Sequence, residues 1–130
     1  MYLDTNAIIY LTEGNPGFKA SIEGLFLEIE QAGALLITSE LTYTEVLVFP
    51  FRTGNAELAT AYERLLDTLV DTIPLGRKQL FLAARLRADV PKLRTPDSLH
   101  LATAILADAD VFASGDAGID VPGPMKKYLL

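Results

Sequence analysis

The sequence predicts one α/β domain whose sheet is mostly parallel and covered by helices on both faces. Short apolar runs that suit buried strands alternate along the chain with longer segments whose apolar residues recur at helical spacing. The length of 130 residues is typical of a single domain, and a composition with 50% hydrophobic and 22% charged residues supports a buried core. Disorder as the main state is therefore excluded.

Turn and capping residues divide the first half of the chain into elements. Segment 14–17 reads Gly-Asn-Pro-Gly, a strong break, while Ser39 and Asn55 are residue types that cap helices. Pro50 should end or kink its helix, because proline removes a backbone hydrogen bond. The expected elements are a strand ending at Asp4, a short helix, a helix from Phe18 to about Gly33, a strand at 35–37, a helix after Ser39 and a helix after Asn55.

The second half of the chain is expected to supply two strands and two helices. Thr95 followed by Pro96 is typical of a helix start, with Thr95 as the N-cap and Pro96 at the first helical position. The expected elements are a strand within 70–75, a basic helix from Gly76 to near Val90, a helix from Thr95 to about Ala107, a strand at 111–113 and its exit at 114–116.

The composition excludes several kinds of site. The chain has no cysteine, which excludes disulfide scaffolds, thiolate zinc sites and cysteine nucleophiles. His100 is the single histidine, which excludes any site built from two. No apolar stretch is long enough to span a membrane, and Asp4 comes too early for a secretory leader. We therefore expect a cytoplasmic protein with no membrane partner.

The basic residues are concentrated in one part of an acidic chain. The net charge is −6, yet residues 77–94 hold six basic side chains against Asp89 alone, a local charge of +5. A polyanion such as RNA would have to approach this side of the protein. The alternative is a solvated helix face whose long side chains cover apolar neighbours.

Acidic residues follow two of the expected strands. Asp4 comes after the first strand and Asp116 after the fourth, and ligands of open α/β sheets bind outside the carboxyl ends of the strands. Asp97 falls in the first turn of a helix, where the helix dipole alone would also favour an acid. Glu45 lies mid-helix on the face of Leu41 and Phe49, where an ionised carboxylate needs a positive partner.

Two partners for Glu45 stay open at this point, a salt bridge to an arginine or a metal shared with the three aspartates. Several clustered carboxylates repel one another, so a cluster requires a divalent cation to supply positive charge. Ligation by oxygen alone selects Mg²⁺ or Mn²⁺ over zinc.

Four segments resemble the four motifs of the PIN domain family, in order and with family-like spacing. They are LDTNAIIY at 3–10, SELTYTEV at 39–46, RTPDSLHLATA at 94–104 and ASGD at 113–116. The resemblance implies a PIN-like three-layer α/β/α sandwich over residues 1–130, acting as a single nuclease domain. It also implies an Mg²⁺- or Mn²⁺-dependent endoribonuclease of the kind found as VapC-type toxins in toxin–antitoxin pairs.

The resemblance assigns a role to individual residues of this chain. Asp4, Glu45, Asp97 and Asp116 match the acidic quartet that binds the metal and carries out catalysis. Thr5, Asn6 and Ser114 match supporting positions beside the acids. The last motif departs from the family pattern, because Gly115 stands where a polar side chain is frequent.

His100 follows Asp97 by three residues and could be taken for a general base. Its neighbours Leu99, Leu101 and Ala102 favour instead an imidazole that is packed or hydrogen-bonded.

The expected reaction is metal-assisted hydrolysis of RNA phosphodiester bonds, with the basic segment holding the phosphate backbone. The substrate-binding candidates are Arg94, Arg85, Arg87 and Lys92. One alternative is a partner-binding module with a damaged site, which only Gly115 favours. Another is a small-molecule phosphatase, against which Asn6 counts because an Asp-x-Asp motif would need an acid there.

Apolar residues exceed what a lone domain needs. They are Val46, Leu47, Val48, Phe49 and Phe51 along one helix, and Met125, Tyr128, Leu129 and Leu130 at the end. These side chains could form a homodimer face or a groove for an antitoxin helix, or else ordinary core and a docked C-terminus. The resemblance implies a cognate antitoxin as partner.

Overall fold

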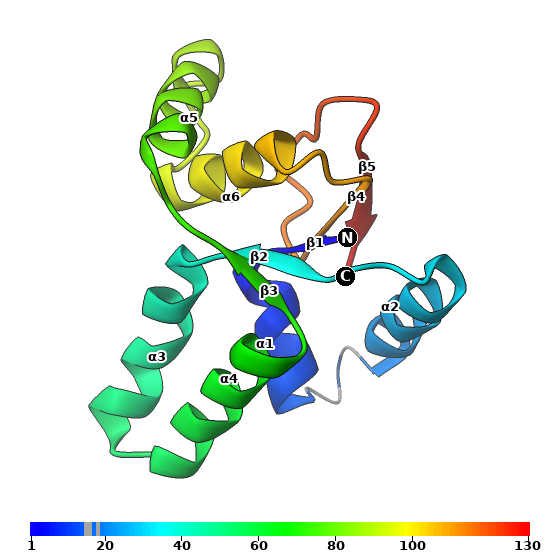
Figure 1. Cartoon of the computed structure of the whole chain (residues 1–130), viewed down its shortest axis with the longest axis vertical. Helices are drawn as coiled ribbons and strands as arrows, with labels where there is room; N and C mark the ends of the chain where they lie inside the picture. The colour runs from blue at the N-terminus through cyan, green and yellow to red at the C-terminus, as the bar shows by residue number, and fades with distance from the viewer. Residues whose placement is uncertain (15–16, 18) are drawn as a thin grey trace.

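A computed structural model describes residues 1–14, 17 and 19–130, and within them five short strands pair in parallel in one sheet (Figure 1). The spatial order is β3-β2-β1-β4-β5. The strands are β1 (Tyr2–Leu3), β2 (Ile37–Ser39), β3 (Asp71–Ile73), β4 (Val111–Ser114) and β5 (Lys126–Leu129). The parallel sheet confirms the predicted fold class.

Helices cover both faces of this sheet. Figure 1 shows α5 and α6 on one side of it and α1, α3 and α4 on the other. The helices of the described residues are α1 (Thr5–Glu13), α2 (Lys19–Ala32), α3 (Leu41–Thr53), α4 (Ala56–Thr68), α5 (Arg77–Asp89) and α6 (Thr95–Leu106). The molecule is therefore the three-layer sandwich that the resemblance implied.

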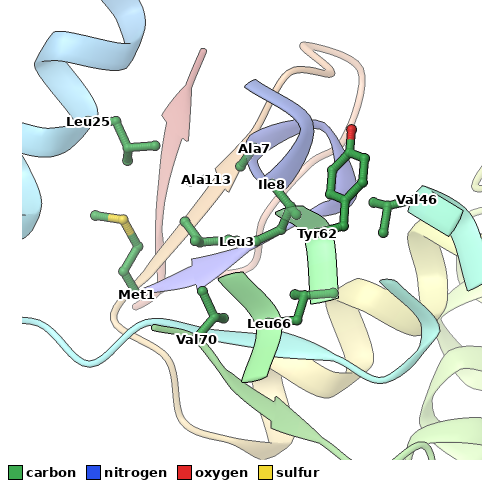
Figure 2. Packing of buried hydrophobic residues seen from close by; sticks show 10 residues of the cluster. All are labelled: Met1, Leu3, Ala7, Ile8, Leu25, Val46, Tyr62, Leu66, Val70 and Ala113. Carbon is green, nitrogen blue, oxygen red and sulfur yellow. The ribbon is translucent and has the colours of Figure 1, made fainter. Parts of the chain in front are cut away.

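The central strands send alternate side chains into two different cores. Tyr2 and Phe112 pack with residues of α6, whereas Leu3 and Ala113 pack on the opposite face. Successive side chains of a strand point to opposite faces, so two-residue and four-residue strands suffice to join both cores. Figure 2 shows Leu3 between Ile8 of α1 and residues of α4 in the second of these cores.

Several predicted boundaries are correct. Gly14 ends α1 in the left-handed conformation with φ 61°, and the side chain of Asn55 caps α4 by accepting a hydrogen bond from the Leu58 amide. The basic helix begins after Gly76 and ends before Val90. Asn15, Pro16 and the predicted helix start at Phe18 lie outside the described residues.

The second strand was predicted two residues too early. It begins at Ile37, while Leu35 is 76% exposed. The strand was predicted from the apolar residues at 35–37, and this criterion left out Thr38 and Ser39, which are fully buried. Thr38 satisfies its hydroxyl by donating to the Leu3 carbonyl at 2.7 Å, so a polar residue can occupy the core strand.

Pro50 does not end its helix, contrary to one reading of the sequence. Helix α3 continues to Thr53 and ends at Gly54, whose φ of 66° provides the left-handed cap. The Pro50 ring is fully buried and its carbonyl accepts a hydrogen bond from the Asn55 amide at 2.8 Å. The burial of the Pro50 ring and the hydrogen bond from Asn55 therefore compensate for the backbone N–H that proline lacks.

Two further predictions are corrected by the structure. The N-cap of α6 is Arg94, not Thr95, because Arg94 has extended backbone angles and helical residues start at Thr95. The C-terminal segment, for which the sequence analysis predicted no strand, forms β5, which pairs with β4. Among the described residues, no helix combines the length and the apolar character needed to cross a bilayer.

The strand order places a crevice at the centre of the sheet. The chain builds outward in one direction through β2 and β3 and in the other through β4 and β5, so the order reverses between β1 and β4. Ligands of open parallel sheets bind at such a reversal, beyond the carboxyl ends of the strands. The residues that follow Leu3 and Ser114 lie at this point.

Candidate active site

Asp4 lies at the carboxyl end of the central strand. Its amide donates to the Ala113 carbonyl at 3.1 Å, and its Oδ1 accepts a hydrogen bond from the Ala7 amide at 2.9 Å, which caps α1. Only 5% of the residue is exposed. Burial raises the pKa of Asp4, and hydrogen bonds from Ser114 and Ala7 only partly oppose this. No ion pair forms with Asp4 among the described residues.

Glu45 reaches the same region from α3 and makes direct contact with α6. Its Oε1 lies 2.6 Å from Nε2 of His100 and accepts a hydrogen bond from the Thr5 hydroxyl at 2.7 Å. Burial alone would raise the pKa of Glu45, but the hydrogen bonds from His100 and Thr5 outweigh burial and lower it. The positive partner expected from the sequence is therefore not an arginine in direct contact. Arg94 acts on Glu45 from farther away.

Asp97, in the first turn of α6, pairs with the residue that caps the helix. The Nε of Arg94 donates to Oδ2 of Asp97 at 3.0 Å. The two side chains differ in environment, since 75% of the Arg94 side chain and 18% of the Asp97 side chain are exposed. The charge of Asp97 also raises the pKa of Asp4, so these two carboxylates lie within electrostatic reach of each other.

Asp116 lies in the loop that leaves β4. Its amide donates to the Ser114 hydroxyl at 3.0 Å, and its Oδ1 accepts from the Gly118 amide at 2.7 Å. Asp97, Asp116 and Glu45 all raise the pKa of Arg94, with Asp97 contributing most. Arg94 therefore lies within reach of three of the four predicted acids.

The four predicted acids gather at one end of the sheet without meeting at one point. Within the part of the chain that the structure describes, no three acidic or histidine side chains are close enough together to hold an ion as they stand. The donors nevertheless suit Mg²⁺ or Mn²⁺, because all four are carboxylates and the buried Asp4 has no cation of its own. The four carboxylates could hold the metal once Arg94 releases Asp97.

The sequence pattern of the PIN domain family matches residues 1–122. The chain belongs to the PIN domain family. Members of this family are typically nucleases that bind Mg²⁺ or Mn²⁺. No curated protein is similar enough in sequence to count as a relative.

Solved structures of several toxin–antitoxin complexes share this fold. A chain of a toxin–antitoxin complex from Klebsiella pneumoniae superposes with a TM-score of 0.69 at 22% identity, covering 96% of this chain and 93% of that one. A chain of VapBC2 from Rickettsia felis, bound to a promoter DNA fragment, gives 0.70 at 16% identity, covering 88% and 86%. A chain of FitAcB from Neisseria gonorrhoeae gives 0.67 at 18% identity, covering 90% and 88%.

The supporting residues predicted for the PIN domain take different places. Thr5 contacts Glu45 directly, and Ser114 binds both Asp4 and the Asp116 amide. Asn6 is exposed and lies against Gly115. A Cβ at Gly115 would come within 3.2 Å of the Asn6 Cβ, so the glycine permits a close approach of β4 to α1. The departure from the family motif therefore has a packing reason.

A pocket of about 500 Å³ adjoins the acids of this PIN domain. Arg94, Asp97 and Asp116 lie on its wall together with Lys92. Asp89, Asp120 and Gly118 also line it, and the rest of the wall is apolar, namely Leu86, Val90, Leu93, Leu101, Ile119, Val121 and Pro122. The pocket thus combines a charged region with an apolar surface.

The four predicted substrate-binding cations separate into two groups. Arg94 and Lys92 line the pocket. Arg87 donates from Nε to the Leu93 carbonyl at 2.8 Å and so holds the α5–α6 connection, while Arg85 is exposed on α5 outside the pocket wall. The cations nearest the acids are therefore those of the loop before α6.

Two residues of the site were missed by the sequence analysis. Tyr2 was assigned only as the start of a strand, yet its hydroxyl lies 2.7 Å from Nδ1 of His100. Lys127 binds the carbonyls of Asp116 and Ile119, each at 2.6 Å, and fixes the loop after β4. The only signal for Lys127 was a basic residue in an unpredicted strand, which is too weak to indicate this role.

Proposed function

We propose that residues 1–130 of this PIN domain act as an Mg²⁺- or Mn²⁺-dependent endoribonuclease that hydrolyses RNA phosphodiester bonds. The observation that carries the proposal is the gathering of four carboxylates at the sheet reversal beside a pocket with basic residues. The charge of Asp97 acts on Asp4, and Asp97, Asp116 and Glu45 act on Arg94. Family membership supports the same reaction.

Asp4, Glu45, Asp97 and Asp116 would hold the metal. A bound metal would polarise a phosphate oxygen and lower the pKa of the attacking water, so that this water loses a proton more readily. Asp4 is held rigidly by the α1 cap, so its carboxylate cannot move away from the crevice without losing a hydrogen bond. Hydrogen bonds from His100 and Thr5 lower the pKa of Glu45 and so favour the ionised form that a metal ligand requires.

Arg94 and Lys92 would bind the RNA backbone at the pocket wall. These two cations share the wall with Asp89, Asp97, Asp116 and Asp120, so a bound divalent metal would be needed to offset the negative charge that a phosphate meets there. A phosphate that binds Arg94 would also compete with Asp97 for the guanidinium and so free that carboxylate for the metal. Substrate and metal binding are then expected to favour each other.

The cellular role that fits this activity is that of a toxin paired with an antitoxin. The three similar solved chains come from complexes described as toxin–antitoxin, VapBC2 and FitAcB. We propose that the protein acts in the cytoplasm, forms a homodimer and is held inactive by a cognate antitoxin. Val48, Phe49 and Phe51, exposed on α3, would contribute to one of these interfaces.

Gly115 no longer favours a non-catalytic module, because its small size has a packing reason. The test is cleavage by tag-free protein of a single-stranded RNA, with Mg²⁺ or Mn²⁺ and with a chelator. DNA of the same sequence and a small phosphomonoester serve as the other substrates. We expect RNA cleavage that requires metal and is lost in Asp4→Asn. Metal-dependent hydrolysis of the phosphomonoester alone would indicate a phosphatase, and no hydrolysis of any substrate would indicate a binding module.

A further inference from the structure

The single histidine of the chain lies between a buried tyrosine and the carboxylate of Glu45. His100 is 3% exposed and uses both ring nitrogens, Nδ1 toward the Tyr2 hydroxyl at 2.7 Å and Nε2 toward Oε1 of Glu45 at 2.6 Å. These contacts join β1, α6 and α3, three elements far apart in sequence. The three side chains therefore form one chain of hydrogen bonds, here called the Tyr2–His100–Glu45 chain.

Tyr2 is the fixed end of this chain. Its ring is fully buried, stacks on Phe112 with centroids 5.2 Å apart and planes at 4°, and meets the His100 ring edge-on at 5.9 Å. Burial raises the pKa of Tyr2 well above its ordinary value, so the hydroxyl keeps its proton and can donate it. A hydroxyl held by a stacked ring cannot follow the imidazole if the imidazole moves.

The neighbours of His100 determine which nitrogen donates to Glu45. Thr5 donates its own proton to Oε1 of Glu45, and its oxygen lies 3.0 Å from Nε2 of His100. Nε2 thus faces two oxygen atoms, and only a proton on Nε2 makes both contacts favourable. Nδ1 can then accept the proton of Tyr2, which fixes both the orientation and the protonated nitrogen of the ring.

The two hydrogen bonds to Glu45 fall on the same oxygen. His100 and Thr5 both contact Oε1, and among the described residues no hydrogen bond is formed to Oε2. Glu45 retains 27% exposure of its side chain. One oxygen is therefore held by the protein while the other stays free to face a metal or a water.

We propose that Tyr2 and His100 are positioning residues that hold Glu45 through Oε1 and direct its Oε2 toward the metal and the attacking water. The proposal rests on the proposed function, since it assigns these two residues to the same site. Neither residue touches the reacting atoms. Loss of residues that orient a metal ligand or its neighbour typically lowers metal affinity or activity by roughly 10- to 100-fold.

The first test compares two tyrosine variants that lose the same atom. Tyr2→Phe removes the hydroxyl from His100, while Tyr62→Phe removes a hydroxyl that donates to Glu13, away from the acids, from a residue that is 2% exposed. We expect Tyr2→Phe to weaken Mn²⁺ binding severalfold in a calorimetric titration and Tyr62→Phe to leave it unchanged. Equal loss in both variants would assign the effect to general stability and overturn the proposal.

The second test uses variants of the histidine itself. His100→Leu should lower the Mn²⁺ affinity by about 10- to 100-fold. His100→Gln offers an amide N–H to Glu45 and should recover part of that affinity. If the leucine variant fails to fold, Tyr2→Phe alone decides the question. Wild-type affinity in a folded His100→Leu protein would show that Glu45 needs no positioning.

A spectroscopic measurement separates this proposal from the proposed function. His100 is the only histidine, so ¹⁵N spectra of the metal-free protein report one imidazole. We expect a protected Nε2 proton in the wild type that exchanges faster with water in Tyr2→Phe and not in Tyr62→Phe. Should the wild type bind no Mn²⁺, the proposed function fails, while an unchanged imidazole spectrum in Tyr2→Phe overturns the positioning role independently.

Discussion

Arg94 binds the carboxylate of Asp97 through Nε at 3.0 Å, yet the arginine side chain is 75% exposed and the aspartate side chain only 18%. An ion pair with one partner so exposed is weak, because water screens it and the long side chain is free to move. The guanidinium is thus a removable counter-charge for a carboxylate that a metal would need. Its position links metal binding to the binding of a phosphate.

Arg94→Gln should therefore change metal and RNA affinity in opposite directions. Removing the cation frees Asp97, so Mn²⁺ should bind severalfold more tightly, while RNA should bind more weakly because a phosphate contact is lost. Calorimetry with Mn²⁺ and salt-titrated RNA binding check the two effects. Weaker Mn²⁺ binding by the variant would mean that Arg94 supports the metal site and does not compete with it.

Asp4→Asn tests the metal site through stability. Burial raises the pKa of Asp4, which means that its ionised form is less stable in the fold than in the unfolded chain, so the neutral amide should preserve or raise metal-free stability at pH 7. At Mg²⁺ a hundredfold above its dissociation constant, the wild type should gain about 2.7 kcal/mol and the variant much less. Thermal melts with and without Mg²⁺ measure both, and a wild-type midpoint that ignores Mg²⁺ and Mn²⁺ would contradict the site.

Gly115→Asn introduces a polar side chain of the kind that the resemblance places at this position. Here we expect it to destabilise the protein by up to about 1 kcal/mol, the lower end of the cost of overpacking, since its Cβ would come within 3.2 Å of the Cβ of the exposed Asn6. Chemical denaturation measures the change, and single-turnover cleavage of RNA measures the effect on Asp116. Faster cleavage without loss of stability would show that the glycine had damaged the site.

Lys92→Ala and Arg85→Ala compare a cation of the pocket wall with a cation of the same charge outside it. Lys92→Ala should weaken RNA binding and reduce the salt dependence by about one unit of slope, as expected for one lost phosphate contact. Arg85→Ala should have a smaller effect, because Arg85 does not line the pocket. Binding curves at several salt concentrations decide between them, and a larger effect of Arg85 would place the RNA along α5.

The sequence predicted the positions of candidate site residues that directly follow the carboxyl end of a strand. Asp4 and Asp116 could be assigned to a shared edge because each follows an apolar strand, and β1 and β4 do lie side by side. The partner of Glu45 could not be assigned in this way, since His100 comes 55 residues later and meets Glu45 only through the packing of α3 and α6.

The fifth strand and the true limits of β2 illustrate a second difficulty. β5 begins with Lys126 and Lys127, so its sequence lacks the continuous apolar run that predicts a buried strand. Its pairing with β4 through backbone hydrogen bonds cannot be read from side-chain types. Thr38 and Ser39 are buried polar residues in the core of β2 and are satisfied by distant partners such as the Leu3 carbonyl. Hydrophobic periodicity detects helices and strands that bury apolar side chains. It does not detect strands whose buried residues are polar and are satisfied by hydrogen bonds to residues distant in sequence.

The pairing of β1 with β4 has a consequence for biosynthesis. Tyr2 pairs with Phe112, so the middle of the sheet joins residues near the two ends of the described chain. Contacts this distant in sequence form late and slow the folding of a domain. A ribosome carries Asp4 and Glu45 long before Asp97 and Asp116 have emerged, and the crevice closes only when β4 docks. If the proposed function holds, a nascent chain has no assembled site with which to cleave RNA until β4 and Asp116 have emerged.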